Sequence, residues 1–67
     1  MLRDLFSVHI RKLRKEKNLS QEKFAEKVGV STTTVQRWEY AKDAPEFDRL
    51  ERIAQALDCP VKDLFNF

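Results

Sequence analysis

The chain has 67 residues, of which 13 are Lys or Arg and 11 are Asp or Glu, and it contains a single Cys and a single His. One Cys cannot form an internal disulfide, and one Cys with one His cannot supply the ligands of a structural zinc site. The composition therefore excludes stabilisation by a disulfide or by structural zinc. The fold must rest on apolar packing, for which a hydrophobic fraction of 42% is adequate, and one Gly with two Pro favours helices over short strands.

The first predicted helix runs from about residue 4 to residue 17. Phe6, Ile10 and Leu13 fall at i, i+4 and i+7, which places them on one apolar stripe of this helix. Basic residues gather in its last turns, where they complement the helix dipole. Asn18 follows the predicted end and suits the left-handed conformation that often closes a helix.

A second, short helix is predicted after Ser20, whose hydroxyl can accept a hydrogen bond from a free backbone N–H of the first turn. Its inner face holds Phe24, Ala25 and Val28, and Gly29 ends it. Gly29 is the only glycine of the chain, so its simplest use is a positive-φ residue that lets the next helix leave at a sharp angle.

Ser31 is predicted to be the N-cap of a third helix, which runs from 32 to about 40 and buries Val35 and Trp38. A loop at residues 44–45 follows, since the residue before a proline avoids the helical region.

Two further helical segments are predicted, one before and one after the break at Cys59 and Pro60. Their expected apolar faces comprise Phe47, Leu50, Ile53, Ala54 and Leu57 in the fourth helix, and Val61, Leu64 and Phe65 in a last short turn. The predicted fold is all-α, a compact bundle of four to five short helices within a single domain, residues 1–67.

Residues 21–40 have the spacing of a helix-turn-helix. Two short helices that cross steeply need a small residue where they approach, a glycine at the turn and apolar anchors under the second helix. Ala25 and Gly29 meet the first two needs. The apolar positions are Phe24, Val28, Val30, Val35 and Trp38.

With these residues the chain resembles the lambda-repressor-like family, which contains phage repressors, Cro proteins and bacterial regulators of the xenobiotic-response-element type. The resemblance extends over about residues 6–65. It is carried by the segments IRKLR (10–14), LSQEKFA (19–25), VGVS (28–31), VQRWE (35–39), IAQAL (53–57) and LF (64–65). The resemblance implies five helices, with the third lying in the major groove of DNA.

The outward side of the third helix carries polar side chains, namely Thr32, Thr33, Thr34, Gln36, Arg37 and Tyr40. Consecutive threonines are poor helix formers, but a Thr offers a hydroxyl and a methyl that can meet thymine. The resemblance places Thr32 and Thr33 at base-reading positions, with Gln36 and Arg37 one turn further. Arg37 could bind guanine O6 and N7, and Gln36 could bind adenine N6 and N7.

The resemblance also implies contacts with DNA phosphates and an ion pair. The expected phosphate contacts are Gln21, Ser31, Thr34, Tyr40, Lys42 and Arg14. Gln21 would in addition brace the first recognition residue, and Arg14 would pair with Glu39. The family often has Gly where this chain has Ala41. If the loop keeps a positive φ there, Ala costs about 1 kcal/mol, and otherwise the loop follows another path.

The remaining residues of chemical interest are expected to be structural. His9 is expected to be a solvated or partly buried helix residue and Cys59 a small core filler. Leu64, Phe65 and Phe67 are expected in the core more than in an interface, yet an apolar C-terminal patch is also the surface on which a homodimer could form.

No enzyme, cofactor, metal or small-molecule ligand is expected, because the sequence offers no glycine-rich loop, ligand cluster or nucleophile with a base. No apolar run approaches the roughly 18 residues that a membrane span needs, and the first residues lack the apolar segment of a secretory signal. A cytoplasmic protein is therefore expected.

Charge is distributed unevenly: residues 1–20 have six basic and two acidic side chains, whereas residues 43–67 have three basic and six acidic. This asymmetry would orient the molecule toward a polyanion, although basic side chains that merely solvate the first helix explain the charge alone more simply.

The sequence therefore predicts a sequence-specific transcriptional regulator, a repressor, that binds double-stranded DNA. The DNA-binding antitoxin of a toxin pair and the controller protein of a restriction system share this biochemistry and are not separated by the sequence. The alternative from another class is a helix-turn-helix module reused as a protein-interaction adaptor, in which residues 32–37 form an ordinary solvated surface.

Overall fold

Four α-helices and two short 3₁₀ helices form the fold in the computed structural model, which describes residues 2–67. The α-helices are α1 (Leu2–Glu16), α2 (Gln21–Val28), α3 (Thr32–Glu39) and α4 (Leu50–Ala56), and the 3₁₀ helices are η1 (Phe47–Arg49) and η2 (Val61–Phe65). Residues 2–67 contain no strand, so the prediction of an all-α fold is confirmed. The last predicted turn of helix is a 3₁₀ helix, and the fourth predicted helix begins as one.

Local capping explains where α2 and α3 begin and end. The Ser20 hydroxyl accepts a hydrogen bond from the Lys23 N–H at 3.0 Å, and the Ser31 hydroxyl accepts one from the Thr34 N–H at 3.2 Å. Gly29 follows α2 with φ of 87°, in the left-handed region. These three predictions are confirmed, and the left-handed conformation predicted for Asn18 is confirmed by its φ of 58°.

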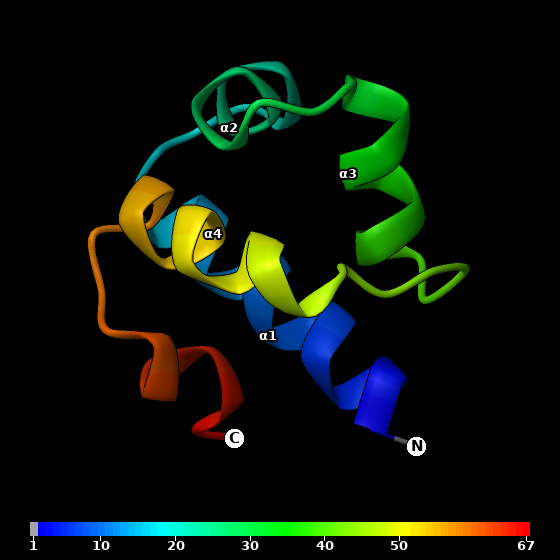
Figure 1. Ribbon diagram of the computed structural model, residues 1–67, viewed down its shortest axis with the longest axis vertical. Helices are drawn as coiled ribbons and strands as arrows, with labels where there is room; N and C mark the ends of the chain where they lie inside the picture. Colours follow the sequence, from blue (N-terminus) through cyan, green and yellow to red (C-terminus); the bar gives the residue numbers. More distant parts are fainter. Residues whose placement is uncertain (1) are drawn as a thin grey trace.

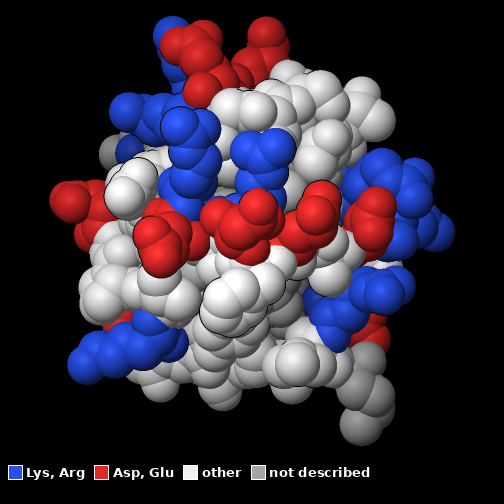
Figure 2. Space-filling view, in the orientation of Figure 1, with Lys and Arg blue, Asp and Glu red and all other residues white. Residues whose placement is uncertain are grey.

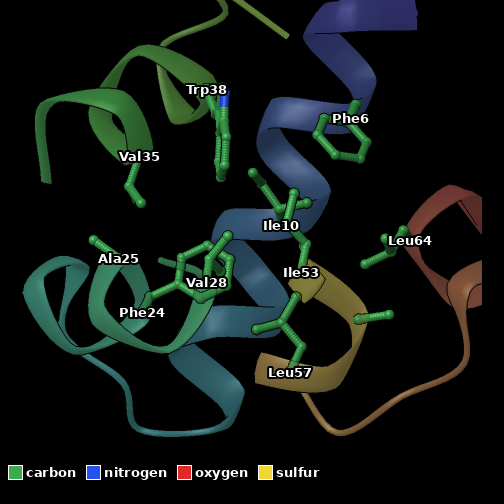
Figure 3. Close-up of a cluster of buried hydrophobic side chains, with 11 residues drawn as sticks. Phe6, Ile10, Phe24, Ala25, Val28, Val35, Trp38, Ile53, Leu57 and Leu64 are labelled. Atoms are coloured by element: carbon green, nitrogen blue, oxygen red, sulfur yellow. The ribbon is translucent and has the colours of Figure 1, made fainter. Parts of the chain in front are cut away.

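One hydrophobic core joins the helices. In Figure 1, α4 lies in front of α1, α2 crosses at one end of both, and α3 stands to the side. The buried side chains meet between these elements and η2 (Figure 3). They are Phe6 and Ile10 from α1, Phe24, Ala25 and Val28 from α2, Val35 and Trp38 from α3, Ile53, Ala54 and Leu57 from α4 and its end, and Leu64 from η2.

Phe47 is not part of this core, which makes its assignment to the inner face of the fourth helix wrong. The chain enters η1 through Glu46 with an extended backbone, and Phe47 stands at the first position of the 3₁₀ turn with 89% of its surface exposed. The apolar spacing that predicted its burial assumed a continuous α-helix, but regular α-helix begins only at Leu50.

The C-terminal residues divide between core and surface. Leu64 is fully buried, as predicted, whereas Phe65 and Phe67 remain 40% and 48% exposed. Phe65 stacks on Phe6 with ring centroids 5.4 Å apart and lies 6.5 Å from the Phe67 ring, yet both C-terminal rings stay partly open to solvent. Burial of Phe67 is therefore a wrong prediction, and burial of Phe65 is only partly right.

Two residues with left-handed backbone provide a paired stability test. Gly29 and Ala41 have φ of 87° and 58°, where a Cβ costs about 1–2 kcal/mol. Gly29→Ala is expected to lower the free energy of unfolding by about 1 kcal/mol. Ala41→Gly is expected to raise it, by less, because Gly also gains freedom in the unfolded chain. Urea denaturation of both variants checks the prediction, and changes of equal sign would contradict it.

Candidate nucleic-acid interface

The inner face of α3 packs against the rest of the protein, and its outer face is accessible to solvent. Val35 is fully buried and Trp38 is 3% exposed, so the inner face of α3 is fixed against α1 and α2. On the outer side, Thr33 and Arg37 are exposed, and Figure 1 places α3 at the periphery of the molecule. An anchored helix with an accessible polar face is the geometry that the major groove of DNA accepts.

The four predicted base-reading residues share this outer side but differ in accessibility. Thr33 and Arg37 are exposed, one turn apart, whereas Thr32 and Gln36 are half-buried. The side chain of Gln36 donates a hydrogen bond to the Gln21 side chain, with 3.4 Å between Nε2 and Oε1. The structure thus brings the four together on one helix face and holds one of them in place.

Gln21 connects α3 to the protein interior. Its Nε2 donates to Oε1 of Glu39 at 3.1 Å, while its Oε1 accepts from Gln36. The resemblance implied that Gln21 braces the first recognition residue. In the structure the residue of the outer side of α3 that Gln21 contacts is Gln36, in the second turn of the helix.

Beneath Gln21 lies a buried ion pair between α1 and α3. Nε of Arg14 donates to Oε2 of Glu39 at 2.6 Å, and its Nη2 donates to Oε1 at 3.1 Å. A third nitrogen, Nη1, donates to the Leu19 carbonyl at 2.8 Å. Arg14 is 8% exposed and Glu39 only 1% exposed, so the contact predicted between these two residues is present as a structural ion pair.

This burial contradicts the phosphate contact that was also predicted for Arg14. All three guanidinium nitrogens of Arg14 donate to protein acceptors, and the side chain is directed into the protein rather than toward solvent. An arginine that neutralises Glu39 internally cannot at the same time reach a phosphate outside the molecule.

At the C-terminal end of α3, a cation that the sequence reasoning missed lies next to Tyr40. Nη2 of Arg11 donates to the Glu39 carbonyl at 2.7 Å, and its guanidinium carbon lies 5.8 Å from the centroid of the Tyr40 ring. Tyr40 is 58% exposed. Arg11 lies three residues before Arg14 on α1, and this i, i+3 spacing could have indicated that both reach the same side of α3.

The loop after α3 keeps the left-handed turn that was in question. Ala41 has φ of 58°, so the first of the two predicted alternatives is correct and the loop follows the path that positive φ allows. The backbone N–H groups of Lys42 and Asp43 both donate to the Arg37 carbonyl, at 2.9 and 3.2 Å. Lys42 is exposed beside the end of α3.

The two polar residues predicted at the start of α3 contact each other. The hydroxyls of Ser31 and Thr34 lie 2.9 Å apart, and the Ser31 hydroxyl also caps the helix. Ser31 is exposed and Thr34 half-buried, so both lie at the N-terminal end of α3, where free backbone N–H groups favour an anion.

The face that carries α4 has a different character. Figure 2 shows a row of acidic side chains across the middle of this face and a largely uncharged area beneath it. The exposed acidic residues of α4 and the segment before it are Glu46, Asp48 and Glu51. Acidic side chains repel phosphates, so this face is not suited to DNA.

Cys59 and His9 are both half-buried and both lie near Asp63. Burial raises the pKa of the Cys59 thiol, Asp63 and Asp58 raise it further, and Lys17 opposes them. A thiol with a raised pKa stays protonated near neutral pH and is a poor nucleophile. His9 is half-buried, as predicted, and its Nε2 lies 2.6 Å from the Asp63 carbonyl. Residues 2–67 contain no cluster of three or more residues able to ligate a metal.

Comparison with known proteins agrees with this geometry. The model of the helix-turn-helix family matches residues 10–64, which include α2, α3 and the turn between them. The chain belongs to this family. Its match confirms the resemblance to phage repressors that the sequence indicated, and no helix within residues 2–67 is long and apolar enough to cross a membrane.

Two curated relatives of this helix-turn-helix chain are regulators. The transcriptional activator BcrR of Enterococcus faecalis is 33% identical over 61 residues, which are 91% of this chain and 30% of BcrR. The CTXphi transcriptional repressor RstR of Vibrio cholerae is 33% identical over 62 residues, 92% of this chain and 56% of RstR. The chain thus spans little more than half of one relative and under a third of the other.

Two solved structures share the fold along most of their length. The restriction-modification controller protein C.AhdI from Aeromonas hydrophila has a TM-score of 0.90 and 30% identity, covering 94% of this chain and 91% of that one. The P22 c2 repressor, solved with a synthetic operator, has a TM-score of 0.83 and 28% identity, covering 91% of this chain and 92% of that one.

Proposed function

We propose that this chain is a sequence-specific DNA-binding transcriptional regulator, a repressor that acts in the cytoplasm without catalysis. The observation that carries the proposal is the accessible polar face of α3 above a rigidly anchored inner face, with Thr33 and Arg37 exposed and Gln36 held by Gln21. The likeness to the P22 c2 repressor, whose structure was solved in complex with a synthetic operator, also supports DNA binding.

In this proposal α3 enters the major groove of double-stranded DNA. Arg37 binds guanine O6 and N7, Gln36 binds adenine, and Thr32 and Thr33 contact base edges near the start of the helix. Phosphates on either side are bound by exposed or half-buried groups that flank α3. These are Gln21, Ser31, Thr34, Tyr40 and Lys42, and we add Arg11 because its guanidinium lies beside the Tyr40 ring.

A restriction-system controller is the second candidate, because the likeness to C.AhdI extends over 91% of that chain. It would use the same DNA-binding surface, so the two candidates differ in the operator and its neighbouring genes rather than in chemistry. Sequencing the DNA fragments bound in the native genome separates them by the genes that adjoin the binding site.

The first experiment is a fluorescence-anisotropy titration against a pool of random duplexes at two salt concentrations, followed by selection of bound sequences. The proposal predicts an affinity that falls steeply with salt and enrichment of one sequence. Salt-insensitive or absent binding would favour the protein-interaction adaptor instead.

Two substitutions then separate base reading from phosphate binding. Lys42→Ala is expected to weaken all duplexes about equally and to lower the salt slope by roughly 1, because it removes one phosphate contact. Arg37→Ala is expected to cost about 1–3 kcal/mol on the selected duplex and to relax preference at one base pair. The same anisotropy titrations measure both, and equal losses on every sequence would contradict the role of Arg37.

We further propose that the protein binds DNA as a homodimer. A single α3 of 8 residues contacts only a few base pairs, and proteins with one such helix recognise a longer site by binding two half-sites as a dimer.

A further inference from the structure

The loop after α3 is hydrogen-bonded to the backbone of Arg37. Ala41 turns the chain back, and the N–H groups of Lys42 and Asp43 both donate to the Arg37 carbonyl. This arrangement brings the Asp43 side chain next to the Arg37 side chain, six residues further along the chain. The contact joins the loop to the residue with the strongest predicted role in base reading.

Both oxygens of the Asp43 carboxylate have donors. Oδ2 accepts from Nε of Arg37 at 3.4 Å, and Oδ1 accepts from the backbone N–H of Ala44 at 3.2 Å. The carboxylate is therefore oriented by the backbone of the next residue, Ala44, as well as by Arg37. Both side chains remain accessible, with 54% of Arg37 and 60% of Asp43 exposed.

The contact engages one particular edge of the guanidinium. Asp43 binds Nε, whereas guanine is gripped by two parallel N–H groups, which the terminal nitrogens of Arg37 can supply. Those terminal nitrogens donate to no acceptor within residues 2–67. Asp43 can therefore stay bound to Arg37 while Arg37 binds a base.

We propose that Asp43 is a positioning residue that holds Arg37 in the orientation that reads guanine. The inference rests on the proposed function of Arg37. A free arginine side chain loses much rotamer freedom when it binds, and a partner that restricts it beforehand lowers that cost. Without Asp43, Arg37 would still reach DNA, but it would discriminate less sharply between the right and the wrong base pair.

The charge of Asp43 acts in the opposite direction on overall affinity. A carboxylate at the edge of a DNA-binding surface repels phosphates of every sequence, so removing it should strengthen binding to all duplexes. Positioning thus has a signature of two parts: general affinity rises while discrimination falls. If Asp43 were instead a competitor that keeps Arg37 from guanine, its removal would leave discrimination unchanged or increase it.

The test compares Asp43→Ala with Asp43→Asn and Glu46→Ala. Glu46 is an exposed acid of the same loop that forms no ion pair within residues 2–67, so it is the control for charge. Affinities are measured for the selected duplex and for the same duplex altered at the base pair where Arg37→Ala loses its preference. The resonance of the Arg37 Nε–H group, observed by NMR in the free protein, reports the contact itself.

Asp43→Ala is expected to reduce discrimination at that base pair about three- to fivefold, the size of one exposed charged contact, and to shift the Nε–H resonance. Asp43→Asn should retain most of the discrimination, because its amide oxygen can still accept from Nε. Glu46→Ala removes the same charge from the same loop and should leave discrimination unchanged. Unchanged discrimination in Asp43→Ala, or an equal loss in Glu46→Ala, would overturn the inference.

The wild type and Arg37→Ala test the proposed function separately. If the wild type selects no sequence, or if Arg37→Ala keeps every base preference, the proposed function of Arg37 is wrong and the inference falls with it. If both behave as proposed and only Asp43→Ala keeps full discrimination, the inference alone is wrong.

Discussion

Replacing Glu39 with alanine is expected to lower the free energy of unfolding by about 3–5 kcal/mol, because the change leaves the Arg14 guanidinium buried without its counter-charge. The wild-type carboxylate is 1% exposed and accepts from Arg14 and Gln21. Removing it leaves the buried Arg14 charge without its partner and takes one acceptor from the half-buried Gln21 amide. Few other single substitutions in a chain of this size should have so large an effect.

The loss is large compared with the total stability of the domain. Globular proteins are stable by about 0.05–0.15 kcal/mol per residue, which gives this chain about 3–10 kcal/mol. The expected loss from Glu39→Ala therefore removes a large part of this stability, and all of it at the lower end of the range. Trp38 is the only tryptophan and is 3% exposed, so its fluorescence during urea denaturation measures the change directly.

A double substitution tests the physical reason for the loss. Arg14→Met with Glu39→Leu removes both charges together and fills the space with apolar side chains, which in other buried pairs is close to neutral. The double variant should recover most of the stability that Glu39→Ala loses. If Glu39→Ala costs under about 1 kcal/mol, the pair behaves as a solvent-exposed ion pair and its burial does not stabilise the fold as proposed.

The helix-turn-helix could be predicted because its signals are local. Ser20, Gly29 and Ser31 act through hydrogen bonds or φ angles within a few residues, and the apolar spacing from Phe24 to Trp38 needs only the period of an α-helix. Such features depend little on the rest of the chain, and the structure has them where the sequence indicated.

Features that depend on the way helices meet were harder to predict. Helical period could not show that Phe47 precedes the regular helix and faces solvent, because the 3₁₀ turn at residues 47–49 changes the period. The sequence also gave no sign that Asp43 lies beside Arg37, since no helical spacing links them. That contact follows from the left-handed turn at Ala41.

The exposed apolar residues define the surface proposed for a second copy. Phe47 is 89% exposed and projects beside a hollow that it lines with Asp48, Leu50, Glu51 and Val61. A neighbouring cleft of about 290 Å³ shares Leu50 with this hollow. The cleft is lined by Leu2, Arg3, Phe6, Ala44, Pro45, Leu50 and Phe65. Figure 2 shows the largely uncharged area on this side of the molecule.

The charges around this surface favour a second copy of this chain as the partner. In a two-fold dimer each copy uses the same surface patch. An acidic group near Phe47 of each copy can therefore pair with a basic group at the cleft of the other, which gives two equivalent contacts. Asp48 and Glu51 lie beside Phe47, and Arg3 lies at the cleft. Phe47 of one copy would thus enter the apolar cleft of the other between paired charges.

Phe47→Asp is therefore expected to prevent dimerisation and to lower the affinity for a duplex with two half-sites about a hundredfold, because the second half-site no longer adds to binding. Affinity for a single half-site should change little. Analytical ultracentrifugation measures the first effect, and anisotropy with full-length and half-site duplexes measures the second. Phe47 is not part of the core, so the variant should remain folded.

Val8→Asp is the matched control, because Val8 is 64% exposed on α1 and lines neither the cleft nor the hollow. It introduces the same charge in place of an exposed apolar residue and should leave both the dimer and the two-site affinity intact. Equal losses in the two variants would mean that added negative charge, rather than a lost interface, weakens binding. A Phe47→Asp protein that still binds two half-sites as tightly as the wild type would show that the copies meet elsewhere or bind independently.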